Sequence, residues 1–66
     1  MEKLIDNDYR VRGLSFCVVS VGTEFLAMQN LTDEQKKNTN YLREVHTGDT
    51  LEEVKQNISS FGGFYN

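Results

Sequence analysis

The sequence predicts a small α+β domain in which a three-stranded antiparallel sheet packs against one C-terminal helix. The expected order is strand, strand, short helix, strand, helix. Three observations predict this fold. The run SFCVVSV at residues 15–21 is rich in β-branched residues, apolar residues alternate again after a glycine turn, and residues 50–61 show a helix cap followed by helical spacing. With 66 residues, we expect the range 1–66 to form a single small domain.

The two leading strands form a predicted hairpin. We expect the first strand over residues 9–21, with Gly13 as a bulge or bend and residues 1–8 as a terminal arm. The turn VGTE at residues 21–24 supplies the glycine that a tight hairpin needs at positive φ. The second strand, FLAMQN, then follows at residues 25–30.

The middle of the chain predicts a short helix and a third strand. Thr32 and Gln35 have the spacing of a capping box, and the turn-forming residues that follow end the helix near Asn38. A longer helix that continues through Val45 is the alternative. We favour a strand at Tyr41–His46, because it leads directly into the turn signal TGD.

The last element carries the strongest pattern. Thr50 and Glu53 have the spacing of a second capping box, which predicts that a helix begins there. Its apolar residues recur at helical spacing and form one stripe: Leu51, Val54, Ile58 and Phe61. The pair Gly62-Gly63 is expected to end the helix.

Both faces of the strand at residues 15–21 are apolar. Phe16 and Val18 point to one face, and the alternate residues Cys17, Val19 and Val21 point to the other. A single amphipathic helix can cover only one face of a small sheet. The second face must therefore be covered by the chain ends, by a second copy in a homodimer, or by a different protein.

Composition limits the partners. Ten acidic and seven basic residues give a net charge of −3, and no basic patch of the kind that binds nucleic acid directly is visible. No apolar run approaches the length of a membrane span, so we expect a cytoplasmic protein without membrane contact. A domain of this size is marginally stable, and one cysteine excludes an internal disulfide. Docking on a partner or oligomerisation is the expected source of additional stability.

The residues with the strongest chemistry do not form a recognisable catalytic or metal motif. Cys17 lies within an apolar strand, where a thiol usually acts as a small buried hydrophobe. His46 and Asp49 flank one turn and are the only metal candidates, but two ligands fall short of a site. A surface histidine beside a helix cap is the simpler interpretation of His46. We expect no enzymatic activity and no cofactor.

A cluster of acidic residues is the predicted binding surface. On a solvated face these side chains serve as helix caps, and the functional alternative is a surface that imitates phosphates and occupies a basic groove. Exposed aromatic residues near the end of the sequence would add apolar contacts. The predicted partner-binding residues are Glu44, Asp49, Glu52, Glu53, Phe64 and Tyr65.

Two resemblances accompany this interpretation. The segment HTGDTLEEVKQNI at residues 46–58 resembles the "GDTLEEAxxNA" turn and helix of HicB-type antitoxins, which implies a small β-β-β-α sheet domain. The chain departs from that family because NLTDEQKKNTN replaces the expected "PDLPG" segment.

As a short, acidic chain without catalytic motifs, the protein is also similar to phage-encoded inhibitors such as type II anti-CRISPR proteins. That similarity implies an inhibitor that binds a larger, basic, nucleic-acid-handling protein, for example a CRISPR nuclease. The alternative is a HicB-like antitoxin or another self-associating regulatory domain.

Overall fold

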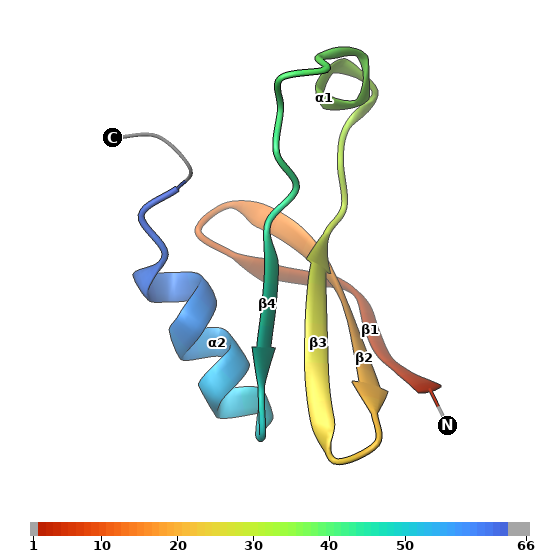
Figure 1. The fold of residues 1–66 in the computed structure, drawn as a ribbon, viewed down its shortest axis with the longest axis vertical. Helices are drawn as coiled ribbons and strands as arrows, with labels where there is room; N and C mark the ends of the chain where they lie inside the picture. Colours follow the sequence, from red (N-terminus) through yellow and green to blue (C-terminus); the bar gives the residue numbers. More distant parts are fainter. Residues whose placement is uncertain (1, 64–66) are drawn as a thin grey trace.

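The fold is α+β, with a four-stranded antiparallel sheet and two helices in a computed structural model that describes residues 2–63 (Figure 1). The elements are β1 (Glu2–Val11), β2 (Leu14–Val21), β3 (Glu24–Gln29), α1 (Asp33–Lys37), β4 (Val45–Gly48) and α2 (Leu51–Ser60). Neighbours in sequence are neighbours in the sheet, in the order β1-β2-β3-β4. The predicted α+β class is confirmed, but the sheet has four strands where the sequence predicted three; the predicted short helix corresponds to α1 and the predicted C-terminal helix to α2.

The additional strand arises at the N-terminal end. The single strand predicted over residues 9–21 is in fact divided between two strands, and the described part of the predicted arm, residues 2–8, belongs to β1. The turn between them is Arg12-Gly13, with φ of 55° and 73°. Two central residues at positive φ are the requirement of a type I′ hairpin. Gly13 is therefore a residue of a tight turn between two strands, and not a bulge or bend within a single strand as the sequence predicted.

The next elements follow the sequence more closely. Gly22 turns the chain at φ 61° between β2 and β3. The capping box of α1 is present, because Thr32 Oγ1 accepts from Gln35 N (3.1 Å) and Gln35 Oε1 accepts from Thr32 N (2.9 Å). This short helix ends at Lys37, as predicted.

The third predicted strand begins too early. Pairing with β3 starts at Val45 and not at Tyr41. At the preceding position the Gln29 N–H donates to the Glu44 carbonyl (2.9 Å), but the Glu44 N–H donates to the Gln29 side-chain oxygen (3.2 Å). A side chain thus takes the place of the backbone partner, and the regular ladder begins one residue later.

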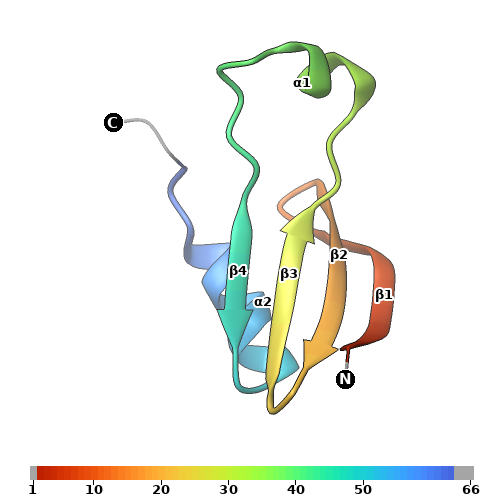
Figure 2. The same ribbon diagram turned by 45° about the vertical axis from the view of Figure 1, so that its right-hand side comes forward.

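Helix α2 packs on one face of the sheet and completes the core (Figure 2). Thr50 Oγ1 caps it by accepting from Glu53 N (3.1 Å), whereas the Glu53 carboxylate reaches Asp49 N instead of closing the predicted box. Of the predicted stripe, Leu51 remains 41% exposed. The fully buried core consists of Phe16, Val18, Ala27, Val54 and Ile58.

Helix α2 lies very close to β4. A Cβ atom added at Gly48 would lie 2.9 Å from Glu53 Cβ and 3.0 Å from Val54 N. Only glycine fits there without moving the helix. Within residues 2–63, none of the helices has the length and apolar character that crossing a membrane requires.

Candidate functional site

The sheet face opposite α2 carries no helix of the described chain (Figures 1 and 2). Phe16 and Val18 on β2 are buried in the core that α2 completes. Because side chains alternate along a strand, Cys17, Val19 and Val21 lie on the other face. The expectation that one helix covers only one face is therefore confirmed. The described part of the N-terminal arm does not cover the second face either, since it is the edge strand β1.

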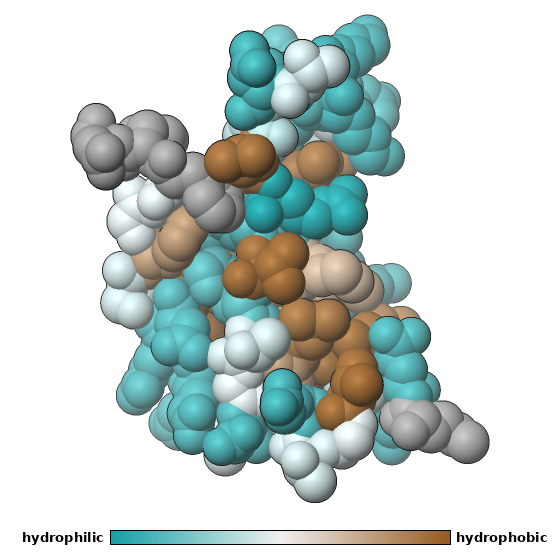
Figure 3. Space-filling model, viewed as in Figure 1, coloured by the Kyte–Doolittle hydropathy of each residue, from teal (hydrophilic) through white to brown (hydrophobic). Residues whose placement is uncertain are grey.

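The register defines which residues share this second face. Cross-strand partners in an antiparallel sheet point to the same side. Val19 pairs with Leu4 on β1 and Leu26 on β3, and Met28 pairs with Cys17 and Val45. We call these six residues the open face: Leu4, Cys17, Val19, Leu26, Met28 and Val45. Hydrophobic residues gather over β3 and β4 on the side seen in Figure 3.

Several of these side chains remain in contact with water. Leu4 is 56% and Val45 51% exposed, Cys17, Leu26 and Met28 are half-buried, and Val19 between them is buried. Contiguous apolar surface of this kind commonly marks an interaction site. Burial of one such side chain contributes about 1.5–3 kcal/mol when it is complete, so a covering surface would add substantially to the stability of a small domain.

Polar residues border the open face at one end. The Asp8 carboxylate accepts from the Ser15 hydroxyl and from Arg10 Nε (3.2 Å), and Asn30 Nδ2 donates to Ser15 Oγ (3.0 Å). The Ser15 hydrogen bond and, secondarily, Arg10 hold the pKa of Asp8 below its ordinary value. We call Asp8, Arg10, Ser15 and Asn30 the polar border. An apolar centre with a polar rim is the usual anatomy of a protein–protein interface.

Acidic residues gather at the opposite end of the sheet. Glu2 and Glu24 both pair with Val21, and the pairing of Phe25 with Gly48 brings the start of β3 beside the turn that leads into α2. We call Glu2, Glu24, Asp49, Glu52 and Glu53 the acidic end; all five are exposed.

The net charge of the chain is concentrated at this end. The acidic end holds five of the ten acidic residues, and two of the seven basic residues, Lys3 and Lys55, lie within three residues of one of them in the sequence. The remaining acids and bases are equal in number. Of the predicted binding residues, the structure brings Asp49, Glu52 and Glu53 together here.

Glu44 was predicted to join this surface, but it lies elsewhere. It is only 7% exposed and forms an ion pair with Arg12 Nη2. Arg12 Nε donates to the Ile58 carbonyl (2.8 Å) at the C-terminal end of α2, where a positive charge is favourable. The Arg12–Glu44 pair thus joins the β1–β2 turn, the start of β4 and α2, and its role is structural.

His46 is also buried, so the interpretation as a surface histidine is wrong. It is 9% exposed, its ring packs edge-on against Phe16 and Phe61 with centroid distances of 6.0 and 4.9 Å, and its Nε2 lies 3.0 Å from Glu44 Oε1. Asp49, by contrast, is exposed. Among residues 2–63 no three His, Cys, Asp or Glu side chains are placed to hold a metal ion.

Cys17 and His46 cannot act as a pair. His46 pairs with Ala27 in the core face of the sheet, whereas Cys17 belongs to the open face. The sheet itself separates the thiol from the imidazole.

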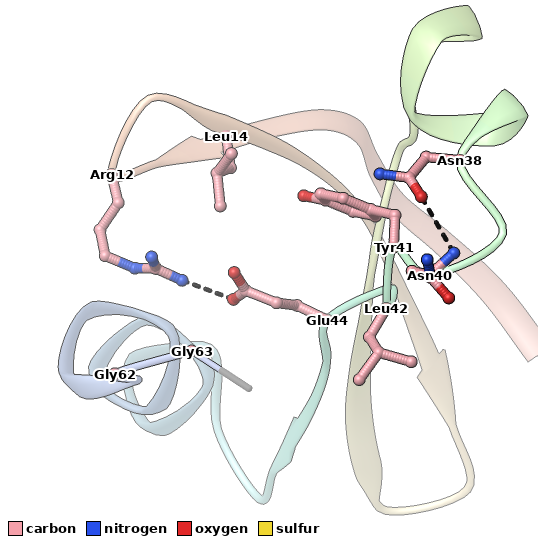
Figure 4. A pocket seen from close by; sticks show the side chains of 9 residues that line it. All are labelled: Arg12, Leu14, Asn38, Asn40, Tyr41, Leu42, Glu44, Gly62 and Gly63. Atoms are coloured by element: carbon pink, nitrogen blue, oxygen red, sulfur yellow. Dashed lines mark hydrogen bonds and ion pairs between the residues drawn. The ribbon is translucent and has the colours of Figure 1, made fainter. Parts of the chain in front are cut away.

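A cleft of about 510 Å³ opens beside the Arg12–Glu44 pair (Figure 4). Several of its polar groups are engaged within the chain. The Tyr41 hydroxyl accepts from Gln29 Nε2 (2.8 Å) and Gln35 Nε2 (3.1 Å), and both amides are oriented by backbone N–H donors at their oxygens. The Tyr41 hydroxyl oxygen and the Arg12–Glu44 pair are thus engaged in contacts within the chain.

The sequence identified part of this site. Cys17, Val19, Leu26 and Met28 were visible as alternating apolar residues, but Leu4 and Val45 join them only through the register, which the sequence does not reveal. The predicted contacts Phe64 and Tyr65 lie outside the described residues. Comparisons with protein-family models, curated proteins and solved structures gave no match to this chain.

Proposed function

We propose that this protein is a non-enzymatic acidic inhibitor that binds a larger, basic, nucleic-acid-handling protein, in the manner of an anti-CRISPR protein that blocks a CRISPR nuclease. The observation that supports it is the concentration of the net negative charge at the acidic end. Asp49, Glu52 and Glu53 would occupy positions that the phosphates of a nucleic acid occupy in the partner's basic groove.

The physical argument concerns charge distribution. An array of exposed carboxylates creates a local potential that attracts a basic surface and accelerates association. The balanced charges over the rest of the chain direct that attraction to one end. Such binding weakens as salt is added, because exposed charges are screened over about 10 Å at 0.1 M ionic strength.

The test uses two matched charge reversals. Glu52→Lys/Glu53→Lys alters the first turn of α2, and Asp33→Lys/Glu34→Lys makes the same change in the first turn of α1. Both variants gain the same charge and lose two acidic residues from the first turn of a helix. Wild type and the two variants are used to capture proteins from the native host, which are identified by mass spectrometry.

The expected result is a nucleic-acid-handling protein that is captured by wild type and by Asp33→Lys/Glu34→Lys. Its affinity for Glu52→Lys/Glu53→Lys should be at least about tenfold lower, a loss of about 1.4 kcal/mol, and nucleic acid should displace it from wild type. Equal binding by the two variants, or a captured protein that nucleic acid does not displace, would contradict the proposal.

A second candidate is an antitoxin-like or other self-associating regulatory domain. The open face favours it, because this surface is apolar and the acidic end does not account for it. For this candidate the Glu52→Lys/Glu53→Lys change should leave activity intact, whereas polar substitutions on the open face should abolish it.

A further inference from the structure

We propose that a second copy of this chain covers the open face, with the two sheets packed face to face and their strands antiparallel about a twofold axis. This inference does not depend on the proposed inhibitor role, because the open face and the Glu52–Glu53 turn are separate surfaces.

The open face can pack against a second copy of itself that is rotated by 180° about an axis at the level of Val18. On β2, Val19 and Cys17 lie on either side of Val18, while Val21 and Ser15 are each three residues away from it. Consider a twofold axis that lies between the two sheets and runs across the strands at the level of Val18. It places the cross-strand row that contains Val19 in one copy over the row that contains Cys17 in the other. On β2 and β3 apolar side chains then meet apolar side chains, with Val19 and Leu26 of one copy over Cys17 and Met28 of the other, while on β4 Thr47 meets Val45.

Charge selects the antiparallel arrangement. If the strands of the two copies ran parallel, the acidic rows containing Glu2 and Glu24 would meet each other. In the antiparallel arrangement about the axis at Val18, Glu2 of one copy lies over Arg10 of the other. Glu2 pairs with Val21 and Arg10 pairs with Ser15, and Val21 and Ser15 are equally far from the axis on opposite sides. Arg10 contacts Asp8 through its Nε, which leaves its terminal nitrogens for a second carboxylate.

The size of the face determines the expected strength. Four strands at about 4.8 Å spacing and a length of about 20 Å along each strand give a face of about 400 Å², or about 800 Å² over two copies. Stable interfaces bury about 1,600 Å², and smaller ones belong to weak, reversible complexes. The dimer should therefore dissociate at micromolar or higher concentrations.

The first test measures self-association by sedimentation across a concentration series from about 10 μM to about 1 mM, a range chosen for a weak interface. Val45→Lys places a charge in the open face, and Leu51→Lys is the matched control on α2, since Leu51 is also an exposed apolar residue. We expect wild type and Leu51→Lys to dimerise alike and Val45→Lys to dissociate at least about tenfold more readily. A wild type that stays monomeric at about 1 mM, or a Val45→Lys that dimerises normally, would overturn the inference.

The second test addresses orientation. Glu2→Lys places a cation over Arg10 of the other copy and should weaken the antiparallel dimer, and adding Arg10→Glu to the same chain should restore it. In a parallel arrangement Glu2→Lys would relieve repulsion between acidic rows and strengthen the dimer. A stronger dimer would thus refute the antiparallel geometry.

Cys17 provides a readout that requires no substitution. It is the only cysteine of the chain and lies half-buried in the open face. Its rate of reaction with a thiol reagent should fall as wild-type concentration rises through the dimerisation range, while for Val45→Lys the fall should require concentrations at least about tenfold higher. A wild-type rate that is independent of concentration would count against coverage of the face.

Discussion

Replacing Gly48 with alanine tests the close approach of α2 to β4. The added Cβ would lie 2.9 Å from Glu53 Cβ, 3.0 Å from Val54 N and 3.1 Å from Val54 Cγ2. Ordinary carbon contacts are about 3.5–4.0 Å, so the first turn of α2 must move away by several tenths of an ångström. Overpacking of this kind costs about 1–3 kcal/mol, against which the reduced entropy of the unfolded chain returns only about 0.4–1 kcal/mol.

The matched control is Gly62→Ala. No atom lies within 4 Å of the position of its Cβ, and its φ is not in the left-handed region. Both substitutions change the unfolded chain in the same way, so their difference isolates the clash. We expect Gly48→Ala to be less stable than Gly62→Ala by about 1–3 kcal/mol, measured by urea unfolding.

A thermal scan should show the same difference, at about 4–8 °C per kcal/mol for a domain of this size. If the two variants agree within about 0.5 kcal/mol, the usual range for surface substitutions, then α2 does not rest on β4 as described. The explanation of Gly48 by packing would then be wrong.

Three further outcomes follow from the same structure. Glu44→Ala should lower the free energy of unfolding by about 1–3 kcal/mol, because it leaves the buried His46 Nε2 and the partly exposed Arg12 guanidinium without their shared carboxylate; a loss below about 0.5 kcal/mol in urea unfolding would show that these contacts are dispensable. Ser15→Ala should raise the pKa of Asp8 towards the ordinary 3.8, as followed by NMR titration. A carboxyl group whose pKa is lower in the folded than in the unfolded state stabilises the fold at pH values above its unfolded pKa, and this contribution disappears as pH falls through its folded pKa. Because the folded pKa of Asp8 is higher in the variant, the variant should lose this contribution at a higher pH than wild type does. Thr50→Ala should cost about 1 kcal/mol of global stability, whereas Thr32→Ala should cost much less, since α1 buries no residue in the core; equal losses in urea unfolding would contradict this ranking.

The elements that the sequence predicted well are those with local causes. The caps at Thr32 and Thr50, the glycine turn between β2 and β3, and the alternation along β2 all depend on residues a few positions apart. Capping, turn geometry and strand periodicity act over such short distances, so the sequence alone reveals them.

The β1–β2 turn was missed because its signal is weak in sequence. Arg12 adopts φ 55°, which is unfavourable for most non-glycine residues. It holds that conformation while its guanidinium binds the Ile58 carbonyl and Glu44, both distant along the chain. The conformation of the turn is thus accompanied by tertiary contacts that no local pattern reveals.

The same cause explains the incorrect assignment of Glu44 and His46. By residue type both belong on a surface, and the prediction grouped Glu44 with the nearby acids. Burial became favourable because Arg12, 32 residues away, supplies the opposite charge and Phe61 covers the imidazole. Partners at this sequence separation are what a single sequence leaves undetermined.

The two proposed surfaces are compatible with each other in one molecule. In the antiparallel pair, Glu2 faces the polar border of the second copy, while Glu52 and Glu53 belong to α2, on the opposite side of the sheet. A dimer would therefore carry two separate acidic turns, one at each end, and each could engage a basic groove. Because Val45 and the Glu52–Glu53 turn lie on opposite sides of the sheet, the effects of Val45→Lys on self-association and of Glu52→Lys/Glu53→Lys on partner binding should combine additively. Strong coupling between them would mean instead that partner and second copy compete for the same face.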